Sequence, residues 1–239
     1  MESWEAANAI VIEDSWTGLR ELTAARIALG RAGHSLPTQE LLAFQMAHAR
    51  ARDAVHRSLD PASFSGLPLH SAVRDRAEYL RRPDLGRKLN SDSAARVARG
   101  EWDAVIILAD GLSATAVNRH ARAVVDALMP LLDGWRIAPV CVVEQARVAI
   151  GDEIGERIGA ALSLILIGER PGLSSPDSLG AYLTWAPRVG RTDAERNCVS
   201  NIRPEGLAPV LAAQRIATLM HAARDRRVTG VELSGRLLT

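Results

Sequence analysis

The segment from residue 168 to residue 206 holds most of the side chains in this 239-residue chain that could do chemistry. It combines the aromatic residues Tyr182 and Trp185 with many charged ones, and it shows little helical or strand periodicity. Loops of this length are uncommon in compact domains and are usually functional. The pattern predicts a long loop that folds against a polar ligand or another subunit. Its charged side chains include Glu169, Arg170, Arg188, Arg191, Asp193, Glu195 and Arg196.

Glu169 and Arg170 directly follow the apolar run 163–167 and precede a Pro-Gly turn. A carboxylate in this place could accept hydrogen bonds from a ligand's amides or hydroxyls, and the guanidinium could bind a partner's carboxylate. A surface ion pair at the edge of a loop explains the two residues equally well. They are suited to holding a polar group, and they do not form a self-sufficient catalytic set.

Three side chains are candidate nucleophiles. Ser113 lies in DGLSA, which is not the G-x-S-x-G elbow of a hydrolase, and His120 follows about two turns along the same predicted helix. Cys198 lies near Arg196, which could lower the pKa of its thiol. Packing or ligand contact is the better interpretation of Cys198, and a helix cap that of Ser113. Lys88 is the only lysine and so the only side chain able to form a Schiff base.

Common cofactor and metal motifs are absent from the sequence. No G-x-G-x-x-G follows a predicted strand, and there is no G-x-x-x-x-G-K-[ST] phosphate loop. His48 and His56 are eight residues apart, too far for an i, i+4 metal pair, and no Cys/His spacing suggests zinc. The sequence therefore predicts neither a dinucleotide site nor a protein-bound metal.

The elements that must position these residues fall into two regions, a helical N-terminal region (1–100) and a sheet domain (101–239). Residues 19–29 and 38–59 show helical periodicity in the first region. In the second, apolar runs typical of buried strands alternate with helical patterns. This order predicts an α/β fold with a doubly wound, mainly parallel sheet, whose strand-end loops share one edge. The expected strands are 103–111, 137–144 and 163–169, and the expected helices are 113–132, 151–162 and 205–226.

Composition excludes several classes of function. The chain has 29 basic and 28 acidic side chains, so nonspecific binding to nucleic acid or to an anionic membrane is not expected. No apolar run approaches the length of a membrane span, and the acidic N-terminus does not resemble a secretory signal. Two cysteines, Cys141 and Cys198, do not suggest a disulfide scaffold. We expect a cytoplasmic protein.

Several motifs resemble the small subunit of adenosylcobalamin-dependent ethanolamine ammonia-lyases, over about residues 15 to 235. They are RPDLGRKL (82–89), ADGLSATAV (109–117), RVAIGDEIGE (147–156) and the long run from IGERPGL to NIRPEG (167–206). The resemblance implies a Rossmann-like domain that binds cobalamin. It also implies a lyase subunit that is inactive alone and that acts with a large catalytic subunit in the radical deamination of ethanolamine to acetaldehyde and ammonia.

The resemblance also implies the details of the assembly and the site. The cofactor is adenosylcobalamin, and Val148, Glu169 and Cys198 take the family's cofactor-binding positions, while no residue of this chain is catalytic. Ethanolamine is bound mainly by residues of the large subunit, in a hetero-oligomer that is a trimer of heterotetramers. A bacterial microcompartment is the alternative location. No histidine lies in a D-x-H-x-x-G loop, so the cofactor's own base is expected to stay on cobalt.

Two alternatives remain open at this point. The chain could be an assembly module that stabilises the large subunit without contacting the cofactor, or a stand-alone enzyme that uses Ser113 or Cys198. The first predicts unchanged cofactor affinity after substitution of Glu169 or Val148, and the second predicts activity from the isolated chain. A partner-dependent subunit should also expose apolar surface, for which the helical first third is a candidate.

Overall fold

A computed structural model describes residues 16–23, 25–30 and 33–237, and the chain divides into two compact units, residues 1–49 and 50–239. The first unit contains α1 (Thr17–Arg20) and the start of α2 (Thr38–His56), which ends in the second unit. The helix predicted over 19–29 is wrong, because among the described residues of this range regular helix ends at Arg20 with α1. The helix predicted from Thr38 is confirmed, although it ends five residues before Pro61.

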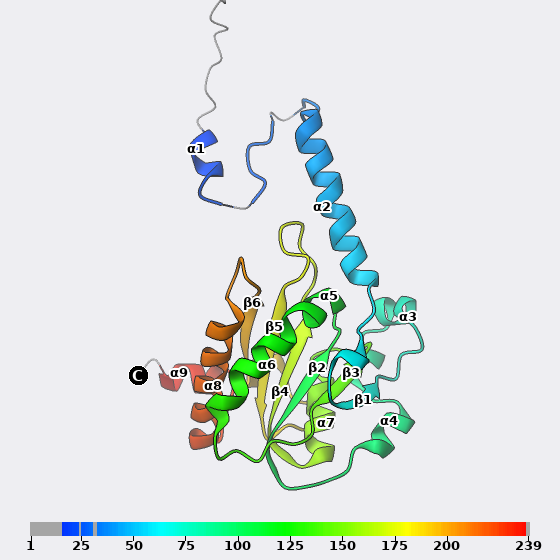
Figure 1. The fold of residues 1–239 in the computed structure, drawn as a ribbon, viewed down its shortest axis with the longest axis vertical. Coiled ribbons are helices and arrows are strands. Elements are labelled where there is room, and N and C mark those ends of the chain that lie inside the picture. The colour runs from blue at the N-terminus through cyan, green and yellow to red at the C-terminus, as the bar shows by residue number, and fades with distance from the viewer. Residues whose placement is uncertain (1–15, 24, 31–32, 238–239) are drawn as a thin grey trace, which may run out of the picture. The chain divides into compact units, whose positions relative to one another are not determined.

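The second unit contains a six-stranded sheet (Figure 1). Its order is β1-β3-β2-β4-β5-β6, with parallel pairing from β1 to β4 and antiparallel pairing of β4 with β5 and of β5 with β6. The prediction of an α/β fold is therefore confirmed, and the sheet is mixed rather than wholly parallel. The strands are β1 (Leu67–His70), β2 (Trp102–Ala109), β3 (Cys141–Glu144), β4 (Ala160–Gly168), β5 (Leu179–Trp185) and β6 (Arg196–Ile202).

Three of these strands lie where the sequence did not predict them. The segment 168–206 was expected to be a loop, and this is wrong, since β5 and β6 occupy 14 of its residues. Strand β1 lies within the region that was expected to be helical. Both β1 and β6 are edge strands of the sheet, with half-buried or exposed residues among buried ones. Such strands owe their conformation to pairing with a neighbour more than to their own propensity.

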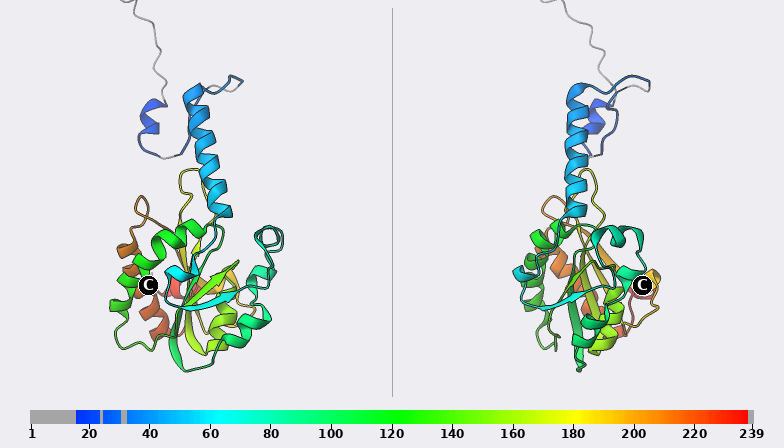
Figure 2. Two further views of the ribbon diagram at one scale, coloured as in Figure 1. Left: turned by 45° about the vertical axis from the view of Figure 1, so that its right-hand side comes forward. Right: turned by 90° about the vertical axis from the view of Figure 1, so that its right-hand side faces the viewer.

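Two apolar clusters hold helices against opposite faces of the sheet. On one face, α5 (Ala114–Ala116), η3 (Val117–Ala121), α6 (Arg122–Leu128) and α8 (Pro209–Arg226) share a core with alternate residues of β2, β4 and β5. On the other face, α7 (Ile150–Ile158) packs on β2 and β4. Strands β2 and β4 are buried along most of their lengths, as expected of strands covered on both sides. The sheet is the middle layer in each view (Figures 1 and 2).

The remaining elements are short and flank the sheet. They are η1 (Pro61–Ser63), α3 (Arg76–Arg81), η2 (Leu85–Arg87), α4 (Ser91–Arg96), η4 (Met129–Leu132), η5 (Asp193–Glu195) and α9 (Val231–Leu237). Ser113 caps α5, since its hydroxyl accepts a hydrogen bond from the backbone N–H of Ala116 at 3.3 Å. The cap predicted at Ser113 is confirmed.

The loops that follow the parallel strands meet at one edge of the sheet, as the sequence predicted. At this edge the backbone of residues 110–113 crosses the end of β4 closely. A Cβ on Gly168 would lie 2.0 Å from the carbonyl oxygen of Ser113, and Gly111 has a φ of +56°. Glycine suits both positions, Gly168 because of the close contact and Gly111 because of the positive φ, and the loop after β2 can therefore lie against the end of β4.

Among the helices in the described part of the chain, none has the length and the apolar composition that a membrane span requires.

Candidate functional site

A row of side chains crosses the sheet on the α7 face, and its last side chain is exposed to solvent. The strand register aligns Cys141, Ile107, Ile165, Tyr182 and Cys198 from β3 through β2, β4 and β5 to β6. The first three side chains are buried in the cluster beneath α7. Tyr182 is half-buried and Cys198 is exposed, whereas Arg196 on the same face is buried against Asp152 of α7. The α7 face of β5 and β6 is therefore open to a ligand around Tyr182 and Cys198.

Glu169 is held over this open face by the strand connections around it. Its carboxylate accepts a hydrogen bond from the Ser178 hydroxyl and another from the backbone N–H of Asn201 at 3.4 Å. Its own N–H donates to the carbonyl of Ser178 at 2.9 Å. A Cβ on Gly180 would lie 2.9 Å from the carboxylate oxygen Oε1 and 3.1 Å from the Tyr182 ring. Glycine at position 180 thus lets the Glu169 carboxylate lie beside Tyr182.

Tyr182 and Cys198 are cross-strand neighbours on β5 and β6. Partial desolvation by neighbouring side chains raises the pKa of the Cys198 thiol, a hydrogen bond with Tyr182 lowers it, and the Glu169 carboxylate raises it further. Burial likewise raises the pKa of Tyr182. Both groups therefore keep their protons at neutral pH. The suggestion that Arg196 activates the Cys198 thiol is wrong, because that guanidinium contacts Asp152 and Asp193 instead.

Val148 lies in the segment between β3 and α7, at the same edge of the sheet. It is half-buried and packs against the apolar cluster that also contacts Tyr182. One turn later, α7 packs on the sheet at Gly151, where a Cβ would be in ordinary van der Waals contact with Ile107 and Ile165 at 3.6 Å. The structure thus brings Glu169 and Cys198 together around Tyr182, and it links Val148 to them through this shared cluster.

A buried carboxylate fixes the conformation of the segment that carries Val148. Asp110 accepts hydrogen bonds from the backbone N–H groups of Gln145 at 2.8 Å and Ala146 at 2.9 Å. Gln145 has a φ of +55°, a strained conformation for a residue with a side chain. Arg76 donates to the carbonyl of Gly111 at 2.9 Å and to the Gln145 side-chain oxygen at 3.3 Å. These bonds hold the segment in its strained turn.

Tyr79 also stabilises the conformation of the segment that carries Val148. Its hydroxyl donates to the carbonyl of Ala146 at 2.9 Å, and its ring lies between the guanidinium groups of Arg76, at 4.4 Å, and Arg147, at 4.1 Å. Guanidinium groups on both faces of a buried aromatic ring are attracted by its electron density. Sequence reasoning missed Arg76 and Tyr79, since both lie on the short helix α3, far from the strand ends in the chain.

The Asp110 carboxyl group has a pKa above its ordinary range. Burial raises its pKa to about 6, because desolvation outweighs the backbone N–H groups and the Arg76 guanidinium. The folded chain therefore keeps a proton on Asp110 in a pH range where the unfolded chain has lost it. By linkage, this contribution to stability is complete below about pH 4 and is lost as the pH rises through about 6.

We therefore expect the free energy of unfolding of Asp110→Asn to lack part of the wild-type pH dependence. Relative to the variant, the wild type should lose about 2–3 kcal/mol between pH 4 and pH 7. Urea unfolding at each pH measures this difference, with exposed Asp126→Asn as the control. A wild type that instead gained stability over Asp110→Asn as the pH rose would show that the N–H groups and Arg76 dominate.

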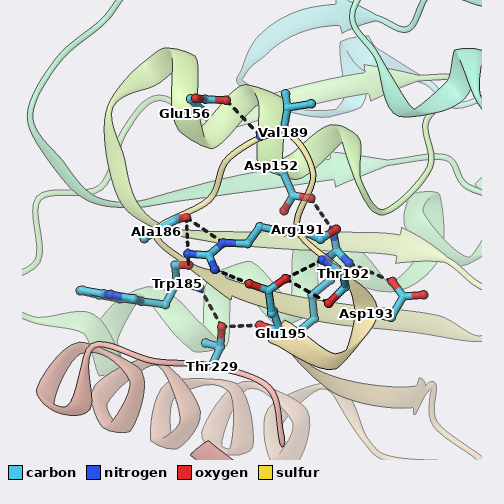
Figure 3. A network of polar contacts seen from close by, with 11 residues as sticks. Asp152, Glu156, Trp185, Ala186, Val189, Arg191, Thr192, Asp193, Glu195 and Thr229 are labelled. Carbon is cyan, nitrogen blue, oxygen red and sulfur yellow. Dashed lines mark hydrogen bonds and ion pairs between the residues drawn. The ribbon is translucent and has the colours of Figure 1, made fainter. Parts of the chain in front are cut away.

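The charged residues around β6 bind one another (Figure 3). Arg196 pairs with Asp152 of α7 and, at 2.9 Å, with Asp193, while Arg191 pairs with Glu195. Thr192 and Glu195 form a capping box on η5. This network lies at the end of the sheet away from Glu169, because Thr184 and Arg196 pair where β4 begins. Four of the charged side chains of this segment are therefore paired within the chain and do not need a ligand as a partner: Arg191, Asp193, Glu195 and Arg196.

The other candidate nucleophiles do not form a catalytic site. The Ser113 hydroxyl donates to the carbonyl of Pro176 at 2.8 Å, and Nε2 of His120 lies 3.3 Å from Asp177. Both contacts hold the 171–178 loop against the helical run that starts at α5. Lys88 is exposed beside η2. Within the described ranges, no group of three His, Cys, Asp or Glu side chains could hold a metal ion.

Comparison with known proteins agrees with the resemblance found in the sequence. A family model described as "Ethanolamine ammonia-lyase light chain (EutC)" matches residues 13–234. A curated ethanolamine ammonia-lyase small subunit from Azotobacter vinelandii is 56% identical, over 92% of this chain and 88% of that protein. The protein of the same name from Ralstonia nicotianae is 54% identical, over 94% of this chain and 90% of that protein.

The family model covers nearly the whole chain, including both halves of the open face on β5 and β6. The two relatives match at more than half of the aligned positions over most of their length. The chain belongs to the ethanolamine ammonia-lyase light chain family.

Proposed function

We propose that this chain holds adenosylcobalamin against the large subunit of an ethanolamine ammonia-lyase, a complex that converts ethanolamine to acetaldehyde and ammonia. Membership in the family supports the lyase and the large-subunit partner. The open face around Tyr182, bordered by Glu169 and Cys198, is the single observation that carries the cofactor-binding role. The bound cofactor supplies the radical chemistry, while this chain supplies placement.

The residues present fit such a cofactor. A corrin is a broad, nearly planar ring whose edge carries amide groups. Tyr182 and Cys198 offer an uncharged surface on which it can lie, since desolvation raises the pKa of both groups and keeps them protonated. Oxygen Oε1 of Glu169 can accept a hydrogen bond from an amide, because the Ser178 and Asn201 donors are both directed to Oε2. Val148 adds an apolar contact at the start of α7.

The role of this chain is to bind and orient the cofactor, and not to transfer protons or form covalent bonds. The ordinary nucleophiles are occupied or remote, as Ser113 and His120 show. The chain is therefore inactive alone in this proposal. Purified without the large subunit but with adenosylcobalamin and ethanolamine, it should release no acetaldehyde.

The remaining features of the proposal follow the family. The domain from about residue 101 to residue 239 is Rossmann-like, and β1 from the preceding region completes its sheet. The complex is a hetero-oligomer, a trimer of heterotetramers, and is located in the cytoplasm or in a bacterial microcompartment. Exposed apolar side chains on α2 support partner binding in the first unit: Leu41, Leu42, Phe44 and Met46.

Alkylation of Cys198 tests the cofactor role without relying on activity. In the assembled complex, adenosylcobalamin should slow the reaction of iodoacetamide with Cys198 at least 10-fold, because a ligand on the face of β6 covers the sulfur. Mass spectrometry of the labelled peptide measures the rate, and buried Cys141 is the internal control. The same rate with and without the cofactor would contradict a binding site at Cys198 and would favour the assembly-module alternative.

A further inference from the structure

A second concave site lies on the other side of the 171–178 loop. A cavity of about 480 Å³ is lined by Arg50, Asp53, Ala54, Arg57, Thr115, Arg119 and Pro176, all of them in the second unit. Three of the lining residues are arginines and one is an aspartate, a formal charge of +2. None of them belongs to the candidate cofactor site described above.

The cavity is built from two helical stripes. Arg50, Asp53, Ala54 and Arg57 follow at i, i+3, i+4 and i+7, the spacing of residues on one helix face. The helical hydrogen bonds of α2 continue to Arg57, whose N–H donates to the carbonyl of Asp53 at 3.0 Å. The facing stripe comes from the helical run that starts at α5 and places Thr115 and Arg119 four residues apart.

The three arginines of the cavity differ in whether a carboxylate pairs with them. Arg119 pairs with Asp177 at 2.9 Å, and the nearest cation to Asp53 is Arg52 at 3.9 Å. Neither Arg50 nor Arg57 forms an ion pair with a carboxylate in the described part of the chain. Two guanidinium groups two helical turns apart therefore line the cavity outside ion-pair distance of any described carboxylate, with Asp53 between them along the helix, and the half-buried Thr115 supplies a hydroxyl donor.

We propose that this cavity is a binding site for a phosphate group. Guanidinium groups bind phosphate oxygens through paired, charge-assisted hydrogen bonds, and Arg50 and Arg57 are two such donors that no described carboxylate pairs with. The phosphate is either free inorganic phosphate or an ester carried by the bound cofactor. The Pro176 wall belongs to the same loop as Ser178, which bonds Glu169, so a ligand on the open face and a phosphate in the cavity contact the two sides of one loop.

Titration of the assembled complex with inorganic phosphate tests the site. Calorimetry should show phosphate binding that weakens at least 10-fold in Arg50→Gln/Arg57→Gln. The control Arg52→Gln/Arg96→Gln removes the same charge from exposed positions outside the cavity and should bind phosphate like the wild type. The site is refuted if neither inorganic phosphate nor the cofactor distinguishes the two double variants.

A second titration identifies the source of the phosphate, and this arm rests on the proposed function. Adenosylcobinamide lacks the phosphodiester of adenosylcobalamin. If the cofactor supplies the ester, Arg50→Gln/Arg57→Gln should raise the dissociation constant of adenosylcobalamin at least 10-fold. The dissociation constant of adenosylcobinamide should not change. A loss of inorganic phosphate binding alone supports a free anion. Failure of both corrinoids to bind the wild-type complex would refute the proposed function, while the inorganic phosphate titration would still decide this site.

An acidic side chain of the large subunit is the competing occupant. In that case Arg50→Gln/Arg57→Gln would lower the affinity between the subunits, and neither phosphate nor the phosphodiester would bind in the cavity. Size-exclusion chromatography of both double variants with the large subunit separates this outcome, which would overturn the proposal.

Discussion

Arg196→Met should lower the free energy of unfolding of this chain by about 3–5 kcal/mol. The side chains of Arg196 and Asp152 are 3% and 2% exposed, so their ion pair lies in the core between β6 and α7. Methionine fills most of the same volume but leaves Asp152 as a buried charge without a partner. Desolvation of an unpaired carboxylate accounts for most of the expected loss, which is a large part of the stability of an ordinary domain.

Two further variants separate charge from packing. Asp152→Asn/Arg196→Met removes both charges and should recover most of the lost stability, as buried pairs replaced together usually do. Arg188→Met changes an exposed arginine of the same connection and should cost less than about 0.5 kcal/mol. Urea unfolding of the four proteins measures these differences. If the single and the double variant were equally unstable, the ion pair would not be the cause.

Glu169→Gln should weaken adenosylcobalamin binding to the assembled complex about 10-fold or more. The substitution keeps the shape of the side chain and one acceptor oxygen but removes the charge that strengthens a hydrogen bond from a ligand amide. A charge-assisted hydrogen bond contributes about 1.5–3 kcal/mol, against about 1 kcal/mol for a neutral one. Equilibrium ultrafiltration with adenosylcobalamin measures the dissociation constant.

The control for this prediction is Glu205→Gln, which removes an exposed carboxylate at the end of the same segment. It should leave the dissociation constant within twofold of the wild type. Size-exclusion chromatography should show both variants in complexes of the same size as the wild type. If Glu169→Gln bound the cofactor as tightly as Glu205→Gln, the chain would be an assembly module and not a cofactor-binding subunit.

The buried half of the fold could be predicted from the sequence because its pattern is strong. Strands β2 and β4 are nearly unbroken apolar runs, and Ser113 supplies a cap at the start of the helix after β2. The carboxyl ends of parallel strands share an edge, so the positions of the Asp110 and Glu169 loops followed directly. Local sequence was sufficient wherever a strand is covered on both faces.

The rest depended on contacts between distant residues. In β5 the apolar side is regular, with Leu179, Ala181 and Leu183, and this alternation was the signal that could have revealed the strand. It was hidden by Gly180 and Thr184 on the other side, which have little or no apolar surface. The role of Gly180 depends on Glu169, which no local pattern connects to it. The place of Tyr182 in the site likewise depends on its contacts with Glu169 and Cys198, which are distant from it in the sequence.

Antiparallel extension explains why the site is open. A parallel strand must be reached by a crossover of a dozen or more residues, usually a helix, which then packs over a face of the sheet. Strands β5 and β6 are reached through the connections 169–178 and 186–195, in which the only helical residues are the single turn η5. The sheet thus gains two strands without gaining a helix on the α7 side. Exposure of Tyr182 and Cys198 is therefore a property of the topology, and from within this chain only a longer connection could cover that face.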